Sequence, residues 1–66
     1  MNARRSAVKA LQAAGYEKKR SGGNHDIFYH KELKCAIPLK RHDFDEGDLR
    51  YIEKEIKLNA RRDRTL

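Results

Sequence analysis

The sequence contains a single cysteine and a single proline, and it has no tryptophan. One cysteine cannot form an internal disulfide, which excludes the disulfide-rich secreted domains and fits a reducing compartment. No stretch approaches the roughly 20 apolar residues that span a bilayer, and the N-terminal segment lacks the apolar core of a signal peptide. The sequence therefore predicts a cytoplasmic protein without a membrane segment.

Length and charge set the next limits. The chain of 66 residues is enough for one small domain with a compact core. It has 16 lysines and arginines against 10 acidic residues, which leaves a net charge of +6. Such an excess attracts polyanions such as RNA, DNA or an acidic protein surface. Charge alone favours a nucleic-acid partner, but it does not separate one from a basic surface that serves only solubility.

Helical and strand patterns alternate along the chain in the order α-β-β-β-α. The predicted elements are a helix over residues 3–14, strands over 16–20, 25–30 and 34–39, turns over 21–24 and 31–33, a helix over about 46–57, and a frayed basic tail over 60–66. Asn2 and Asp45 are the predicted N-caps, while Gly15 and Asn59 are placed to end the two helices. The prediction is an α+β fold with two helices on one face of a three-stranded antiparallel sheet.

The predicted core is small. Its members are Val8, Leu11, Tyr16, Ile27, Phe28, Cys35, Ile37, Leu39, Leu49, Ile52, Ile56 and Leu58, helped by Ala7, Ala10 and Ala14. Double-stranded-RNA-binding domains share this order of elements, but topology alone does not assign a function.

Residues 22–30, with the sequence Gly-Gly-Asn-His-Asp-Ile-Phe-Tyr-His, form the most distinctive segment. This segment resembles the Gly-(Gly)-(Ser/Asn)-His signature of the HicA toxin family. The similarity extends to Leu11 through Gly15-Tyr16, to Ile37-Pro38 followed by Arg41-His42, and to Glu46-Gly47. It covers about residues 3–58 and leaves residues 59–66 as a basic tail of one HicA-like domain. The motif is short, but it lies in the strand context that the family requires.

The resemblance implies a compact fold like that of double-stranded-RNA-binding domains, cleavage of mRNA without a metal or other cofactor, and neutralisation by a HicB-type antitoxin. It places the family's catalytic histidine at His25. Lys40 departs from the family pattern, because many relatives have proline or valine just before the Arg-His pair. This departure concerns the conformation of the following loop rather than the fold.

The chemistry of RNA cleavage is consistent with a histidine as the catalytic residue at position 25. The ribose 2′-hydroxyl attacks the adjacent phosphate once a base removes its proton, and histidine is the side chain that ordinarily titrates near neutrality. The glycine turn lets a sugar–phosphate chain approach closely. The predicted RNA-binding residues are Gly22, Gly23, Asn24, Lys18, Lys19, Arg20, Tyr29, Lys40, Arg41 and His42. Among them, Tyr29 shares the His25 face of a regular strand, where it could stack a base or polarise a phosphate oxygen.

Plainer interpretations stand beside these. His30 and His42 fit surface or hydrogen-bonding roles, although His42 is the second candidate for an acid or a phosphate ligand. Asp26 could orient a neighbouring histidine, but adjacent strand residues point to opposite faces, so a solvent or loop role is favoured. Cys35 fits a buried small hydrophobe. The histidines and the cysteine lack the tight ligand pairs of a structural zinc site, so we expect no metal.

A second class of function stays open, namely a module that holds structured RNA through its basic face without cutting it. Replacing His25 with alanine distinguishes the two classes. A protein that only binds RNA should tolerate this change with little loss, because phosphate contacts dominate its affinity. DNA binding is disfavoured, since neither predicted helix carries a cluster of base-reading side chains behind a tight turn. The intact Gly-Gly-Asn-His segment argues against a protein-interaction domain that has lost catalysis.

Overall fold

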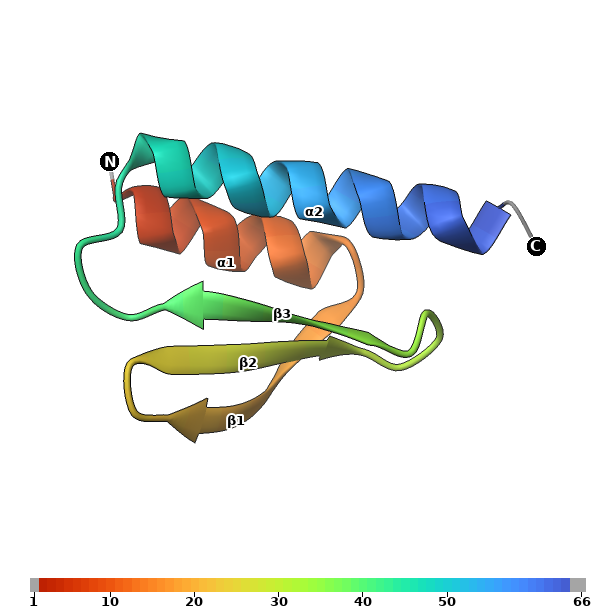
Figure 1. Cartoon of the computed structure of the whole chain (residues 1–66), viewed down its shortest axis with the longest axis horizontal. Coiled ribbons are helices and arrows are strands. Elements are labelled where there is room, and N and C mark those ends of the chain that lie inside the picture. Colours follow the sequence, from red (N-terminus) through yellow and green to blue (C-terminus); the bar gives the residue numbers. More distant parts are fainter. Residues whose placement is uncertain (1, 65–66) are drawn as a thin grey trace.

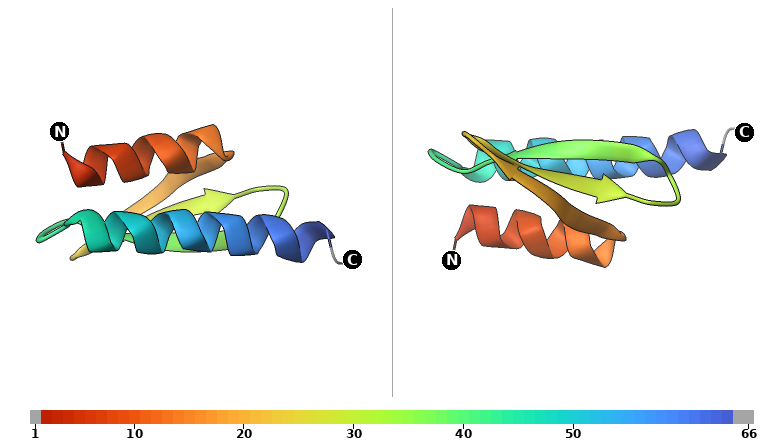
Figure 2. Two further views of the ribbon diagram at one scale, coloured as in Figure 1. Left: turned by 90° about the horizontal axis from the view of Figure 1, so that it is seen from above. Right: turned by 90° about the horizontal axis from the view of Figure 1, so that it is seen from below.

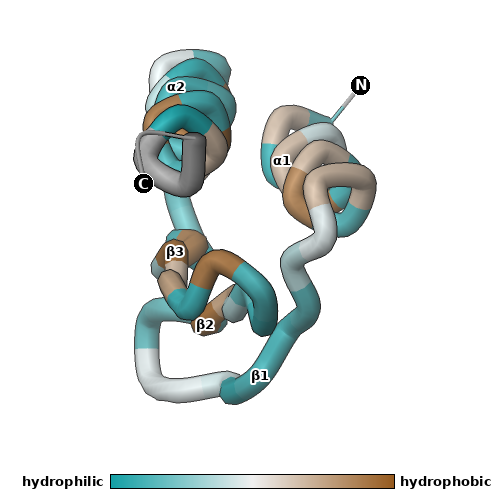
Figure 3. Tube along the Cα trace, turned by 90° about the vertical axis from the view of Figure 1, so that its right-hand side faces the viewer, coloured by the Kyte–Doolittle hydropathy of each residue, from teal (hydrophilic) through white to brown (hydrophobic). Residues whose placement is uncertain are grey.

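A computed structural model describes residues 2–64, the last three of them by their backbone only. The elements are α1 (Ala3–Ala13), β1 (Tyr16–Gly22), β2 (His25–His30), β3 (Cys35–Lys40) and α2 (Glu46–Arg64). The strands form one antiparallel sheet in the order β1-β2-β3. Both helices lie side by side on one face of this sheet (Figures 1 and 3), which confirms the predicted α+β fold.

Helix α1 begins where the sequence predicts. The Asn2 side chain accepts hydrogen bonds from the backbone N–H groups of Arg4 and Arg5 at 2.9 and 3.3 Å, and this satisfies donors that the first turn would otherwise leave free. The chain leaves the helix through Gly15, whose φ of +100° suits glycine. The helix ends at Ala13, one residue before the predicted end.

The first strand is longer than predicted. It runs through Gly22 rather than ending at residue 20, so the tight turn to β2 consists of Gly23 and Asn24 alone. A register shift between Lys18 and Arg20 marks a bulge in this strand. Because a bulge increases local twist, the glycine end of the hairpin turns relative to the rest of the sheet (Figure 2).

The core lies between the sheet and the two helices. Its buried members are Ala7, Leu11, Tyr16, Phe28, Ile37, Leu39 and Ile52, with Val8, Ala14, Cys35, Phe44, Leu49 and Ile56 packed against them. Three core predictions were wrong, and the first is Ala10, which is half-buried and not part of this cluster. Ile27 is half-buried on the opposite face of β2 from Phe28, as strand alternation requires, and Leu58 is 40% exposed.

Helix α2 begins at the predicted cap. The Asp45 side chain accepts from the backbone N–H of Asp48 at 3.0 Å, and the Asp48 side chain accepts from the backbone N–H of Asp45 at 3.1 Å, in the manner of a capping box. The helix continues to Arg64, so the predicted end near residue 57 and the frayed tail over 60–64 were wrong. Neither glycine nor proline interrupts this stretch. Residues 65 and 66 of the predicted tail lie outside the described part of the chain.

Asn59, predicted to stop α2, instead ties it to the sheet. Its side-chain amide donates to the hydroxyl of Tyr16 at 3.0 Å, which connects the later part of the helix to the start of β1. In the described range, no helix combines the length and apolar character needed to cross a bilayer.

Candidate active site

His25 is the first residue of β2 and follows the Gly23-Asn24 turn directly. Its backbone pairs with Gly22 on β1 and with Lys40 on β3, so it lies in the middle strand of the sheet at the end where α2 begins. The side chain is exposed, on the opposite face of the strand from the buried Asp26. A substrate in solution can therefore reach the imidazole.

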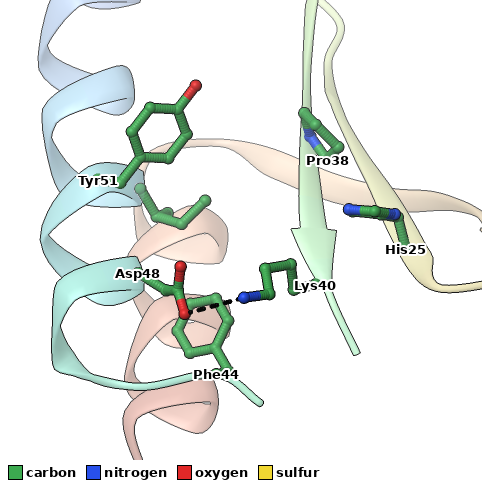
Figure 4. A pocket seen from close by; sticks show the side chains of 7 residues that line it. His25, Pro38, Lys40, Phe44, Asp48 and Tyr51 are labelled. Carbon is green, nitrogen blue, oxygen red and sulfur yellow. Dashed lines mark hydrogen bonds and ion pairs between the residues drawn. The ribbon is translucent and has the colours of Figure 1, made fainter. Parts of the chain in front are cut away.

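Two depressions meet at His25. The loop-side hollow has a volume of about 350 Å³ and is lined by Asn24, His25, Lys40, His42 and Asp43. The helix-side cleft has a volume of about 200 Å³ and is lined by His25, Pro38, Lys40, Phe44, Asp48, Tyr51 and Ile52 (Figure 4). His25 and Lys40 line both depressions, and the imidazole therefore lies between a polar hollow and a largely apolar cleft.

Asp26, the neighbour of His25, is buried rather than solvated, so its predicted loop role was wrong. Its side chain is only 7% exposed, and its carboxylate pairs with Arg4 Nη2 at 2.5 Å and lies 3.7 Å from Arg41 Nε. Arg4 also donates to the backbone oxygen of Lys40 at 2.8 Å, and Arg41 donates to that of Gly23 at 3.4 Å. These contacts join α1, the glycine turn and the exit of β3 around one carboxylate.

Electrostatics keep this carboxylate charged. Burial on its own would raise the pKa of Asp26, but the hydrogen bond from Arg4 and the positive charges of Lys18 and Arg41 outweigh it and lower that pKa below its ordinary value. A charged Asp26 can thus hold both arginines at neutral pH. Arg41, predicted to contact RNA, is engaged here in supporting the turn that carries His25.

Lys40 is held at the rim of the helix-side cleft. Its ammonium donates to the backbone oxygen of Asp43 at 3.3 Å and to the carboxylate of Asp48 at 3.4 Å. The hydrogen bond from the Asp45 amide, followed by the contact with Lys40, lowers the pKa of Asp48 below its ordinary value. The side chain of Lys40 is still 45% exposed, so its charge is accessible to an anion beside His25.

A second hollow lies at the other end of the hairpin. It has a volume of about 430 Å³ and is lined by Gly15, Glu17, Lys18, Lys19, Tyr29 and Lys31. The ammonium of Lys19 is 4.8 Å from the centre of the Tyr29 ring, within the range of a cation–π contact. Tyr29 shares the predicted face of β2 with His25, but four residues of strand place it about 13 Å away.

The predicted RNA-binding residues therefore fall into two groups. The turn residues Gly22, Gly23 and Asn24, together with Lys40, Arg41 and His42, lie around His25. Lys18, Lys19 and Tyr29 form the second hollow, and Arg20, paired with Ile27, lies between the groups. Contact of these residues with RNA stays a prediction.

The remaining histidine and the cysteine are structural. His30 is buried, and its Nδ1 accepts a hydrogen bond from the Leu33 amide at 3.0 Å, so it is a hydrogen-bonding residue but not a surface one. Cys35 is half-buried with its sulfur 3.4 Å from the hydroxyl of Tyr16. Among the side chains that the structure describes, those of residues 2–61, no three His, Cys, Asp or Glu gather where they could hold a metal ion.

Sequence reasoning missed Arg4, Phe44 and Tyr51. Arg4 gave no local signal, because its partner Asp26 is distant in the chain. Tyr51 lies next to Ile52 but outside the buried helical stripe, and its 58% exposure leaves an aromatic ring on the surface. Helical periodicity alone could have identified such an unburied aromatic residue as a functional candidate.

A family model described as HicA toxin of bacterial toxin-antitoxin matches residues 4–58, which include all five elements up to the later part of α2. No curated protein and no solved structure matches the chain. The family match covers most of the chain and includes both the glycine turn and His25. The chain therefore belongs to the HicA toxin family, the toxin components of bacterial toxin–antitoxin systems.

Proposed function

We propose that this toxin is an endoribonuclease that cleaves mRNA without a metal ion and uses His25 as its acid–base residue. The observation that carries the proposal is the placement of an exposed imidazole on a glycine turn, between a polar hollow and an apolar cleft, with Lys40 lining both. The net charge of +6 draws a polyanion to this surface.

The reaction uses the nucleophile that RNA carries. His25 accepts the proton of the ribose 2′-hydroxyl, whose oxygen then bonds to the adjacent phosphorus. The bond from phosphorus to the 5′-oxygen of the next nucleotide breaks, which leaves a 2′,3′-cyclic phosphate, and that oxygen takes up a proton. His42, in the same hollow, is our candidate for the acid. Lys40 stabilises the charge that develops on the phosphate oxygens.

The proposal extends to the partner and the compartment. A toxin–antitoxin system supplies a neutralising partner, and we infer that this partner is a HicB-type antitoxin. It would cover the basic surface around His25, where blocking substrate access is sufficient for neutralisation. Because the substrate is mRNA, the toxin would act in the cytoplasm.

The decisive experiment incubates the purified protein with single-stranded RNA and, separately, with DNA in the presence of EDTA. We expect cleavage of RNA only, loss of cleavage in His25→Ala, and unchanged circular dichroism and melting temperature in that variant. A requirement for added divalent ion, or cleavage that persists in His25→Ala, would overturn the assignment. Full activity of a saturated toxin–antitoxin complex would contradict the inferred mode of neutralisation.

A second function is favoured by one observation, the basic hollow around Tyr29, which lies away from His25. A protein that only binds RNA could use this hollow without any catalytic residue. In that case His25→Ala would bind RNA as tightly as the wild type, and neither protein would cut it.

A further inference from the structure

The helix-side cleft contains an aromatic residue that the reaction described above does not use. Tyr51, on α2, is 58% exposed. It lines the same cleft as His25, and in Figure 4 Pro38 and Lys40 of β3 lie between the two rings. The core does not need this ring, because the neighbouring Ile52 supplies the buried contact of that helical turn.

The cleft has the size and lining of a site for one planar ring. Pro38, Phe44, Tyr51 and Ile52 give it apolar walls. Its volume of about 200 Å³ is below the roughly 300–1,000 Å³ of pockets that hold drug-sized ligands. A bulky segment of protein would not fit, whereas a single ring system stacked on Tyr51 would.

Charge narrows the choice of occupant. Lys40 lies at the rim, and the cleft adjoins the hollow that contains His25 and His42. Two acidic residues line these depressions. Asp48, in the cleft, already accepts hydrogen bonds from Lys40 and from the Asp45 amide, and Asp43, in the adjoining hollow, has its backbone oxygen bound by the Lys40 ammonium. A ligand that fits both depressions has an aromatic ring for the apolar cleft and a negative group beside it for the polar hollow. A nucleotide has this chemistry.

We propose that the helix-side cleft binds one unpaired nucleobase next to the scissile phosphate, and that Tyr51 is the residue on which this base stacks. The inference rests on the proposed ribonuclease function and adds a base subsite to it. With the base in the cleft and its phosphate in the loop-side hollow, the ribose lies at His25, which lines both. Base recognition and presentation of the 2′-hydroxyl are then the same binding event.

The proposal also explains how so small a protein would select single-stranded RNA. Double-stranded RNA keeps its bases stacked and paired, whereas an unpaired base can turn outward onto an aromatic side chain. Stacking on an aromatic residue contributes about 1–3 kcal/mol per base. This corresponds to a factor of about 5–150 in affinity.

The test measures binding separately from cleavage. A six-nucleotide 2′-O-methyl RNA lacks the nucleophile and stays uncut, and six derivatives each lack one base. Fluorescence anisotropy gives the affinity of each RNA for the wild type and for Tyr51→Ala, Tyr51→Phe and Leu58→Ala. Leu58 is the matched control, because it is also exposed on α2 and lies about two turns from Tyr51 on the same side of the helix.

We expect one position at which removal of the base weakens wild-type binding about 5–150-fold. Tyr51→Ala should bind the intact RNA more weakly by a similar factor and be insensitive to base removal at that position. Tyr51→Phe and Leu58→Ala should behave as the wild type. Loss of base dependence in Tyr51→Ala supports the subsite even if the wild type proves unable to cleave RNA, which would refute only the nuclease function.

Any one of four results would overturn the subsite. The wild type could show no dependence on any base, or bind none of these RNAs. Tyr51→Ala could retain full base dependence while the wild type cleaves normally, which would leave the nuclease function intact. Tyr51→Ala could bind the antitoxin more weakly with no change toward RNA, which would assign the cleft to an antitoxin side chain.

Discussion

The two ends of β2 carry histidines in opposite environments. His25 is exposed beside the glycine turn, where two depressions meet. His30 is 8% exposed, accepts a hydrogen bond from Leu33, and packs against the edge of the Tyr16 ring with 5.0 Å between ring centres. The two histidines are five positions apart, and an odd separation along a strand places side chains on opposite faces. Residue type is therefore a poor guide to function here, and position along the strand decides it.

The same contrast holds for the groups around each histidine. The His25 end is organised by the charged carboxylate of Asp26 with Arg4 and Arg41. The His30 end is organised by neutral contacts, including the hydroxyl of Tyr16. One end is held together by ion pairs to a buried carboxylate, and the other closes the core.

Replacing each histidine with alanine should give the largest difference between the two ends of β2, in cleavage rate at one end and in stability at the other. His25→Ala should reduce the rate of RNA cleavage about 10²–10⁴-fold, the range of general acid–base catalysis, with little change in stability. His30→Ala should lower the melting temperature, because it removes a buried ring and leaves the Leu33 amide unpaired, while the folded fraction stays active. Single-turnover cleavage and thermal unfolding of both variants measure this. Equal losses of activity in folded protein would remove the distinction.

The two glycines with positive φ, one near each end of β2, should differ in how much an added side chain lowers the stability of the fold. A Cβ atom at Gly15 would lie 2.7 Å from His30 Nε2, whereas one at Gly23 would meet nothing within 4 Å. Gly15→Ala should therefore lower the free energy of unfolding by about 3 kcal/mol, through backbone strain and steric overlap, and Gly23→Ala by about 1 kcal/mol through strain alone. Urea denaturation gives both values. A larger loss at Gly23 would mean that the turn, not the His30 end, is the more tightly packed region.

Much of this contrast could be predicted from the sequence. The spacing of apolar residues gave the order of elements, and the Gly-Gly-Asn-His segment placed His25 on a turn before a strand. The alternation that puts Phe28 inward also puts Asp26 inward, yet a carboxylate at that position looked like a loop residue. Its burial depends on Arg4 and Arg41, which approach it only in the folded chain.

The helix-side cleft could not be predicted from the sequence either, because its lining residues come together only in the folded chain. Its lining comes from β2, β3, the loop with Phe44, and α2, so no local pattern contains it. The length of α2 was missed because Asn59 looks like a helix stop when its partner is unknown. In the fold, its side chain is bound to the hydroxyl of Tyr16.

Acid should weaken the His25 end first. Because the pKa of Asp26 is lowered in the folded state, its ion pairs stabilise the fold above the ordinary aspartate pKa, and this contribution is lost as the pH falls through the folded pKa. Asp26→Asn should unfold about 2 kcal/mol more easily at neutral pH, since it removes a charged hydrogen bond. The difference from the wild type should begin to shrink below about pH 4, the ordinary aspartate pKa, and disappear only once the pH has fallen below the lowered pKa of folded Asp26. Denaturation between pH 2 and pH 7 tests this, and a constant difference across that range would contradict it.

Alkali should weaken the His30 end. Burial, together with the contact with Cys35, raises the pKa of Tyr16 to about 12, while an unfolded tyrosine ionises near pH 10. The folded state thus holds this proton more tightly, so the contribution is complete below pH 10 and is lost as the pH rises toward 12.

Tyr16→Phe keeps the ring but removes the hydrogen bond from Asn59. It should be about 1 kcal/mol less stable than the wild type at neutral pH, and the difference should shrink between pH 10 and pH 12. Lysines titrate in the same window in both proteins, so only the difference between their unfolding curves isolates Tyr16. Parallel curves across that window would mean that the hydroxyl ionises as easily in the fold as in the unfolded chain, and alkali would then not distinguish the His30 end.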